Sequence, residues 1–281
     1  MTRPQASRYS IAALCFLLLE GCAPHYYQES AGEIYRARQQ AQLAPLVSTS
    51  HPALNVENAY VVQRALVKKF QQDSAIVGYK GGLTGIGAAQ KFGLREPVVG
   101  ALFESGKITD DQATPRIARS GFRQLMLELE LGFVFSKPVT QRLKSIEALK
   151  SRVAHIVPAI ELPDLGFEDM PNFKGVDLVA NNVSAHSFIL GRPLPADTPF
   201  DKLVVKLYRG DELIVSGVGS DASPNQWQAA LWLCNKLLAL GYRVKEGQVL
   251  LTGALGKMVP GAAGVYRAHY GDLQVLEFEV R

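Results

Sequence analysis

Two glutamates, Glu128 and Glu130, stand two residues apart inside an alternating apolar segment. Residues 125–135 carry an apolar side chain at every odd position, which is the period-two pattern of a strand. The two carboxylates therefore share the opposite face, with Cα atoms roughly 6.5–7 Å apart. Carboxylate oxygens at that spacing can converge on a hard divalent cation. A half-buried strand with a solvated face explains the same pattern and stays open as an alternative.

Two further charged residues have unusual neighbours. Glu161 follows the apolar run 156–160, where an unpaired buried charge would be very costly. A metal shared with Glu128 and Glu130 would supply the missing partner. Lys80 lies in the glycine-rich segment 77–87, which lacks the Gly-Lys-Ser/Thr ending of a phosphate loop. This lysine can orient an anionic substrate or exchange protons, or it can be an ordinary surface residue of a loop.

The elements that must position these side chains are helices and strands in irregular order. Helices are expected at 55–70, capped by Asn55, at 145–156, and from Ser223-Pro224 to Gly241. Hairpins are expected at 203–216 and 265–280, around Gly210 and Gly271. This order predicts an α+β fold rather than the regular alternation of a doubly wound sheet.

Composition excludes several functional classes. The 281 residues are 47% hydrophobic with a net charge of +4, and no basic run indicates nucleic-acid binding. No apolar span reaches the ~20 residues of a membrane-crossing helix. The five histidines show no zinc-ligand spacing, and His186 is assigned a structural role.

The N-terminus predicts export. Arg3 and Arg8 precede the apolar run 11–19, and the ending Leu19-Glu20-Gly21-Cys22 resembles a bacterial lipoprotein signal. Residues 1–21 would then be a signal peptide and Cys22 the acylated first residue. Residues 22–52 would be a polar tether with an outer helix near 29–42, and residues 53–281 the catalytic domain. The expected location is the cell envelope, anchored by lipid to the membrane and facing the periplasm; the alternative is a cytoplasmic protein.

A set of short motifs occurs in one order along the chain. The motifs are Asn55-Val-Glu-Asn-Ala-Tyr60, Gly78-Tyr-Lys80-Gly-Gly-Leu-Thr84, Glu128-Leu-Glu130, Pro158-Ala-Ile-Glu161, Ala180-Asn-Asn-Val-Ser184 and Leu250-Leu-Thr-Gly-Ala-Leu-Gly256. Their order and spacing resemble the 2-keto-4-pentenoate hydratase and 4-oxalocrotonate decarboxylase group of the fumarylacetoacetase-like superfamily. The resemblance runs from about Asn55 to the C-terminus.

The resemblance implies a fold, a site and a reaction. The fold would be a barrel-like roll of curved, mainly antiparallel sheets with flanking helices, assembled as a homo-oligomer. Glu128, Glu130 and Glu161 would hold Mg²⁺ or Mn²⁺, with Lys80 as the catalytic residue. Substrate would lie near Leu83, Thr84, Asn182, Ser184, Thr252 and Gly253. The reaction would be hydration of a small 2-oxo or 2-hydroxydienoate acid such as 2-hydroxypenta-2,4-dienoate.

Departures from the family pattern keep other functions open. Asn181 replaces the usual aspartate, the usual arginine after the third glutamate is absent, and Gly264-Val265 stands where Gly-Asp is common. Three alternatives therefore remain: a 2-oxo acid decarboxylase, a lipoprotein that binds a 2-oxo acid without turnover, and an acylpyruvate hydrolase. The last is disfavoured because no residue stands out as a general base.

Overall fold

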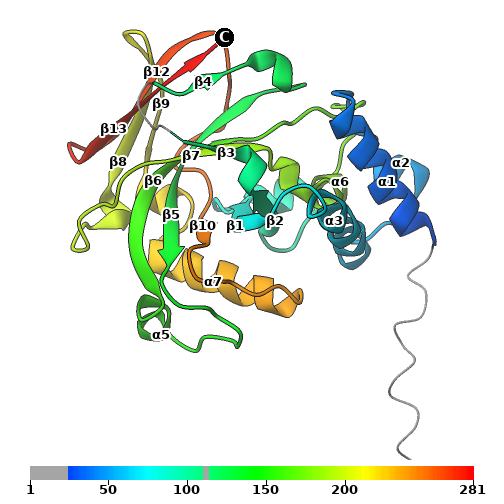
Figure 1. The fold of residues 1–281 in the computed structure, drawn as a ribbon, viewed down its shortest axis with the longest axis horizontal. Helices are drawn as coiled ribbons and strands as arrows, with labels where there is room; N and C mark the ends of the chain where they lie inside the picture. Colours follow the sequence, from blue (N-terminus) through cyan, green and yellow to red (C-terminus); the bar gives the residue numbers. More distant parts are fainter. Residues whose placement is uncertain (1–24, 110–113) are drawn as a thin grey trace, which may run out of the picture.

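The structure is a computed structural model that describes residues 25–109 and 114–281. Cys22 and the expected signal peptide lie outside the described residues. Two sheets lie toward one end of the molecule, and helices gather at the other end and below the larger sheet (Figure 1). The arrangement is α+β, as the irregular order of elements predicts.

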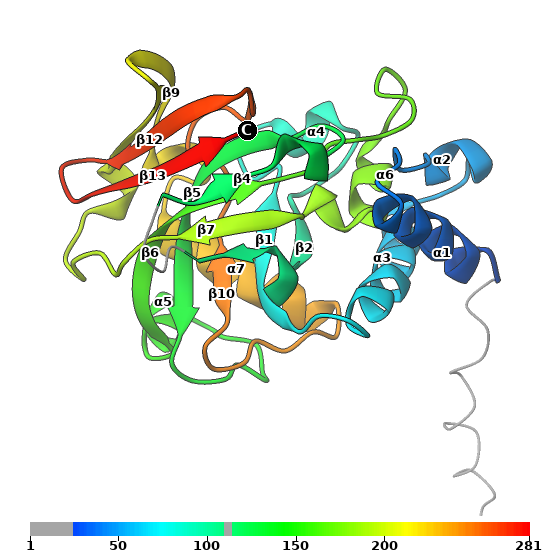
Figure 2. The same cartoon turned by 45° about the horizontal axis from the view of Figure 1, so that its top comes forward.

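The larger sheet carries the functional carboxylates. Its strand order is β2-β1-β10-β5-β6-β7-β3, with β11 paired to β5. It curls, so that β6 and β7 come round towards β1 and β2 (Figure 2). The strands are β1 (Ile76–Gly82), β2 (Val98–Phe103), β3 (Lys107–Ile108), β5 (Met126–Phe135), β6 (Val153–Leu162), β7 (Ser187–Leu190), β10 (Val249–Leu251) and β11 (Val259–Pro260).

The smaller sheet closes one end of the roll. It contains both predicted hairpins, and its order is β4-β13-β12-β8-β9. The Tyr270 hydroxyl donates a hydrogen bond of 2.5 Å to the carbonyl of Ala159, which joins the two sheets. The strands are β4 (Arg116–Ile117), β8 (Val204–Arg209), β9 (Glu212–Val218), β12 (Gly264–Tyr270) and β13 (Gln274–Val280).

The helices cover the roll from outside. They are α1 (His25–Gln39), α2 (Val47–Ser50), α3 (Val56–Phe70), α4 (Ala88–Lys91), α5 (Ile146–Lys150), α6 (Gly175–Ala180) and α7 (Gln226–Ala239). Asn55 caps α3 as predicted, because its side chain accepts a hydrogen bond of 2.9 Å from the Asn58 amide. The cap of α7 is Asn225 rather than Ser223: the Asn225 side chain accepts from the Gln228 amide.

The helix expected at 145–156 is much shorter than predicted. It ends at Lys150, and residues from Val153 onwards form β6. Pairing with β5 on one side and β7 on the other favours the extended chain, because both neighbours supply ladder hydrogen bonds to the apolar run 156–160. This correction matters for function, since Glu161 then lies on a strand.

Residues 25–52 belong to the folded unit. Helix α1 packs along α3 and buries Tyr27, Ala31 and Ile34 in the common hydrophobic core. Further along, Ala44 bridges to Phe167. This packing differs from the expected polar tether, because α1 begins three residues after Cys22. No helix of residues 25–109 and 114–281 has the length and apolar character needed to cross a membrane.

Candidate active site and metal centre

Three glutamates converge on one face of the larger sheet. Strands β5 and β6 are antiparallel, and their register sets Glu128 directly opposite Glu161. Residues opposite each other across a ladder point to the same face, and Glu130 shares that face with Glu128 through the two-residue period. One carboxylate oxygen from each glutamate lies within 4.8 Å of the others. The strand register therefore assembles the three-carboxylate cluster predicted from sequence.

Burial rules out a solvated strand face at this position. Glu130 and Glu161 are fully buried, while Glu128 is half-buried. The Gly253 amide donates to Glu130 Oε2 at 2.7 Å, yet Glu130 Oε1 and Glu161 Oε2 have no hydrogen-bond partner among the described residues. Burial, followed by repulsion from the neighbouring carboxylates, raises the pKa of Glu130 well above its usual value. Buried oxygens without partners are what a bound cation would satisfy.

Lys80 on β1 is the cation of the cluster. Its Nζ lies 2.5 Å from Glu161 Oε1 and donates to the Val183 carbonyl at 3.2 Å. Burial opposes the charged form of Lys80, but Glu161 and the other two carboxylates outweigh it and raise its pKa above the ordinary value. With the carboxylates ionised, three negative charges and one positive charge leave a formal charge of −2. An oxygen-rich site of that charge fits a hard divalent cation such as Mg²⁺ or Mn²⁺.

A strained turn faces Lys80. Asn182, Val183 and Ser184 all have φ between 53° and 54°, in the left-handed region. This conformation costs roughly 1–2 kcal/mol per residue and is rare for a β-branched residue such as Val183. Strand β1 approaches this turn so closely that a Cβ on Gly82 would lie 2.4 Å from Val183 Cγ1. The turn directs the Val183 carbonyl at Lys80, and strain of this kind is often stored at functional sites.

A pocket of about 250 Å³ opens beside the cluster. Lys80 and Glu128 line its charged end, together with Leu83, Thr84 and Ser184 of the predicted substrate residues. The opposite wall is apolar and was not predicted from sequence. Its residues come from distant segments of the chain: Phe92, Leu165, Phe173, Leu178, Val183 and Met258.

Three of the predicted substrate residues lie outside the pocket lining. They make hydrogen bonds within the protein instead. The Asn182 side chain is fully buried and exchanges two hydrogen bonds with the main chain of Ala101, at 2.7 and 2.9 Å. Thr252 donates its hydroxyl to Gln226 Oε1 at 2.7 Å. Gly253 presents its amide to Glu130 at φ 108°, and a Cβ there would collide with Thr84 Oγ1. These residues act on the site through other residues.

The fold matches a solved enzyme over almost its whole length. It superposes on 4-oxalocrotonate decarboxylase from Pseudomonas putida G7, complexed with magnesium and adipate, with a TM-score of 0.83. The match covers 91% of this chain and 97% of that chain at 22% identity. A second structure of that decarboxylase is complexed with calcium and acetate. The likeness confirms the predicted fold class, and the carboxylate cluster agrees with a divalent-metal enzyme.

Sequence relatives identify the family. The chain is 31% identical over 251 residues to 2-keto-4-pentenoate hydratase of Paraburkholderia xenovorans (strain LB400), covering 88% of this chain and 91% of that protein. It is 33% identical to the hydratase of the same name from Burkholderia vietnamiensis (strain G4 / LMG 22486), covering 82% and 88%. No family model matches the chain. The chain belongs to the 2-keto-4-pentenoate hydratase family and is a lyase of the hydratase type.

The envelope localisation predicted from the N-terminus is wrong. Relatives that the chain matches over most of their length are named as 2-keto-4-pentenoate hydratases, and two of them are aligned over 91% and 88% of their own length. The packing of α1 on the hydrophobic core, from Tyr27 onwards, also differs from the polar tether expected for residues 22–52.

Proposed function

We propose that this hydratase adds water to a small dienoate carrying a single carboxylate, such as 2-hydroxypenta-2,4-dienoate, with Lys80 as the catalytic residue. The observation that carries the proposal is the convergence of Glu128, Glu130, Glu161 and Lys80 at the charged end of an otherwise apolar pocket. The sequence relatives support the reaction, since several are named as 2-keto-4-pentenoate hydratases.

The proposed reaction needs proton movement at two places. The 2-hydroxyl of the dienoate gives up its proton while C5 gains one, which leaves an unsaturated 2-oxo acid. The oxygen of water then forms a bond to C4, and C3 takes a proton. A divalent cation, when bound, would polarise the 2-oxo oxygen as a Lewis acid. Lys80, Glu128 and Asp221 are the titratable residues that line the pocket, and Lys80 and Glu128 belong to the charged cluster.

Each residue of the site has a proposed role. Lys80 stays protonated beside the carboxylates and offers its ammonium to a developing oxygen charge or to a carbon that takes a proton. Glu130 is held by the Gly253 amide, so that its free oxygen faces the cluster. The apolar wall keeps the conjugated tail away from bulk water, which strengthens the electrostatic interactions at the charged end.

The pocket favours a substrate with one carboxylate over a dicarboxylate. Lys80 is the only cationic side chain among its described lining residues, and it is already paired with Glu161. A second carboxylate would share the pocket with the apolar side chains of Phe92, Phe173 and Met258 and with the Asp221 carboxylate, which also line it. Burying a charge without a partner is costly, so a dicarboxylate is disfavoured.

Steady-state kinetics test this proposal. Purified enzyme with Mg²⁺ or Mn²⁺ should consume 2-hydroxypenta-2,4-dienoate. The loss of the substrate's ultraviolet absorbance measures the rate. The kcat/KM for 2-oxo-hept-4-ene-1,7-dioate should be at least tenfold lower. Equal values would refute the choice of a single-carboxylate substrate. Inactivity on both acids, or release of carbon dioxide in place of hydration, would refute the hydratase proposal itself.

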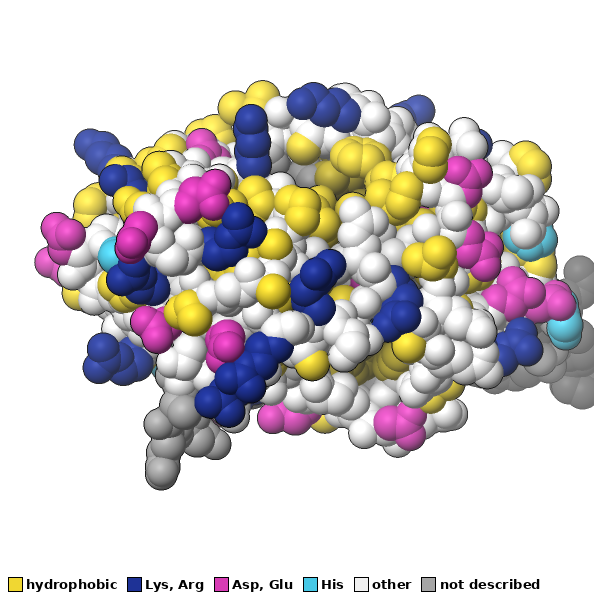
Figure 3. Space-filling model, turned by 90° about the horizontal axis from the view of Figure 1, so that it is seen from above, with side chains coloured by type: hydrophobic (Ala, Val, Ile, Leu, Met, Phe, Trp, Pro, Cys, Tyr) yellow, Lys and Arg dark blue, Asp and Glu magenta, His cyan; other side chains and the backbone are white. Residues whose placement is uncertain are grey.

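We also propose that the chain forms a homo-oligomer through the outer face of the smaller sheet. Val204, Val265 and Val275 are each 45–48% exposed on strands of this sheet. Viewed from above, apolar side chains lie among lysines and arginines over the surface (Figure 3). Light scattering should give a mass larger than one chain, and Val265→Lys should lower it. A monomeric wild type would contradict the proposal.

A further inference from the structure

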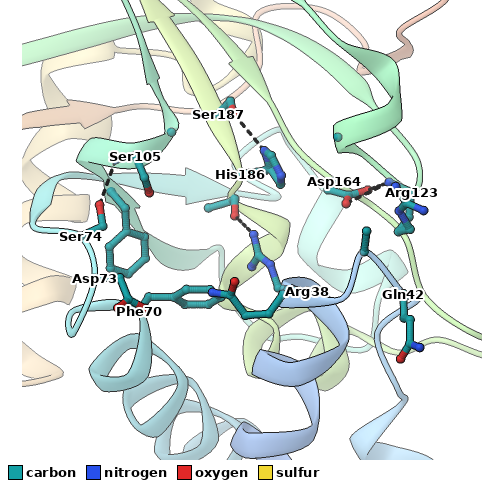
Figure 4. Close-up of a pocket in the computed structure, with 16 residues that line it drawn as sticks. Arg38, Gln42, Phe70, Asp73, Ser74, Ser105, Arg123, Asp164, His186 and Ser187 are labelled. Carbon is teal, nitrogen blue, oxygen red and sulfur yellow. Dashed lines mark hydrogen bonds between the residues drawn. The ribbon is translucent and has the colours of Figure 1, made fainter.

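A second pocket, separate from the active site, lies between α1 and the chain that enters β7. Its volume is about 340 Å³, and it shares no lining residue with the active-site pocket. Arg38 reaches into it from α1, towards His186 and Ser187, with Ser74 and Ser105 on the opposite side (Figure 4). We call it the Arg38 pocket. None of the metal-site glutamates lines it, so the hydratase reaction leaves it unexplained.

Arg38 is a half-buried cation, and its guanidinium carbon lies 5.0 Å from the centroid of the Phe70 ring. Its Nη2 donates to the Ala185 carbonyl at 2.5 Å, whereas its buried Nη1 has no hydrogen-bond partner. No carboxylate in the described parts of the chain forms an ion pair with it. Burial lowers its pKa to about 10, although Asp164 opposes the shift, so it remains charged at neutral pH. A partly desolvated guanidinium that forms no ion pair with the described residues costs free energy, and a bound anion would recover part of it.

The acids around Arg38 are already engaged. Asp164 accepts hydrogen bonds from the main-chain amides of Arg123 and Gln124, at 2.7–3.1 Å. Asp73, which also lines the pocket, accepts from the Tyr35 hydroxyl at 2.8 Å. Their presence disfavours a ligand of high negative charge and favours a singly charged one. The Arg38 guanidinium keeps a free donor for such a ligand.

Apart from the exposed Arg123, the remaining polar groups of the lining are neutral. His186 Nδ1 lies 2.8 Å from Ser187 Oγ, and burial followed by the charge of Arg38 lowers the pKa of His186 to about 4. The imidazole is therefore neutral at pH 7 and adds no competing charge. Ser74 Oγ accepts from the Ser105 amide and keeps its own hydroxyl proton for a ligand. Hydroxyl groups around a guanidinium form a donor set for oxyanions.

We propose that the Arg38 pocket binds a small, singly charged oxyanion, with Arg38 Nη1 as its principal donor. A carboxylate and monobasic phosphate share this chemistry and are the two sources to be distinguished. The backbone connects the Arg38 pocket to the active site. Arg38 holds the Ala185 carbonyl, two residues after Val183, whose own carbonyl accepts from Lys80.

Thermal unfolding of the metal-loaded enzyme provides the first test. Sodium acetate and sodium phosphate are compared with sodium chloride at equal ionic strength, on wild type, Arg38→Gln and the control Arg36→Gln. Arg36 is exposed on the same helix and bonds only to the Gly32 carbonyl. An oxyanion at ten times its Kd should raise the Tm of wild type and the control by about 3–5 °C more than that of Arg38→Gln. An equal rise in Tm for Arg38→Gln and Arg36→Gln would overturn the proposal. Such a result would mean that the oxyanion binds elsewhere, for example at the metal centre, which both variants keep.

Crystals of the wild-type enzyme provide a test that needs no variant. Soaks in acetate and in phosphate should show planar or tetrahedral density within hydrogen-bond distance of Arg38 Nη1, and the shape identifies the source. If both soaks show density for a water molecule at Nη1 and for no oxyanion, the proposal is overturned. If Arg38→Gln fails to fold, Arg38→Lys replaces it in the thermal comparison, and the crystallographic result stands independently.

Discussion

Replacing Glu130 with Gln should stabilise the metal-free enzyme and reduce the stabilisation that metal gives. Glutamine keeps the shape of the side chain and can still accept the Gly253 amide through its oxygen. It removes one of three carboxylates that repel one another in a buried site. The metal-free variant should therefore be more stable than metal-free wild type, by about 1–4 kcal/mol if the gain resembles that of replacing a buried ion pair by apolar residues.

Metal should narrow this difference, because it stabilises wild type more strongly than the variant. At a metal concentration 100 times the wild-type Kd, binding contributes about 2.7 kcal/mol to the free energy of unfolding. Loss of one anionic ligand should weaken affinity tenfold or more, which leaves about 1.4 kcal/mol at the same concentration. A domain of this size shifts its Tm by about 2–4 °C per kcal/mol. Wild type should thus gain about 5–11 °C from metal and Glu130→Gln about 3–6 °C at most.

Differential scanning calorimetry with EDTA, Mg²⁺ and Mn²⁺ measures both effects. Glu246→Gln is the matched control, because Glu246 is exposed and lies outside the cluster. It should behave as wild type in every condition. If metal raises the Tm of Glu130→Gln and wild type equally, Glu130 is not a metal ligand. If metal-free Glu130→Gln is less stable than wild type, the repulsion argument fails.

Three further predictions concern the surroundings of the cluster. Lys80→Met should lower kcat by about 10²–10⁴, the usual contribution of a general acid or base, while metal-induced stabilisation remains; a kcat within threefold of wild type would exclude Lys80 from catalysis. Asn182→Ala should lower the free energy of unfolding by about 2–3 kcal/mol in urea titrations, because the Ala101 main chain loses two buried partners; a loss below 0.5 kcal/mol contradicts this. The pKa of His186, about 4, lies below the ordinary 6.5, so the unfolded chain binds the proton first as pH falls, and the native state loses stability from pH 6.5 down to 4. His186→Gln should remove this loss, on the order of 3 kcal/mol, and parallel pH profiles of the two proteins would show that the imidazole is not responsible.

Local patterns were enough to single out the three glutamates of the candidate metal site. The two-residue period of a strand places Glu128 and Glu130 on one face whatever surrounds it, and the apolar run before Glu161 indicates a buried carboxylate that needs a partner. Both hairpins and the Asn55 cap also follow from local chemistry, because glycine turns and side-chain caps act within a few residues. The helix predicted at 145–156 failed because the apolar run gains more from two neighbouring strands than from a helix of its own.

Tertiary structure decided how these residues become a site. The register between β5 and β6 sets Glu161 opposite Glu128, and that register depends on pairing between strands far apart in the chain. The left-handed turn at Val183 is unfavourable locally and persists only because Asn182 is locked to β2 and β1 approaches through Gly82. The pocket wall and the Arg38 pocket likewise join segments that no sequence period connects. By itself, the sequence determined which side chains face the same way, because that follows from backbone geometry. Which of them meet was decided by packing and non-local hydrogen bonds, because those form only once the chain has folded.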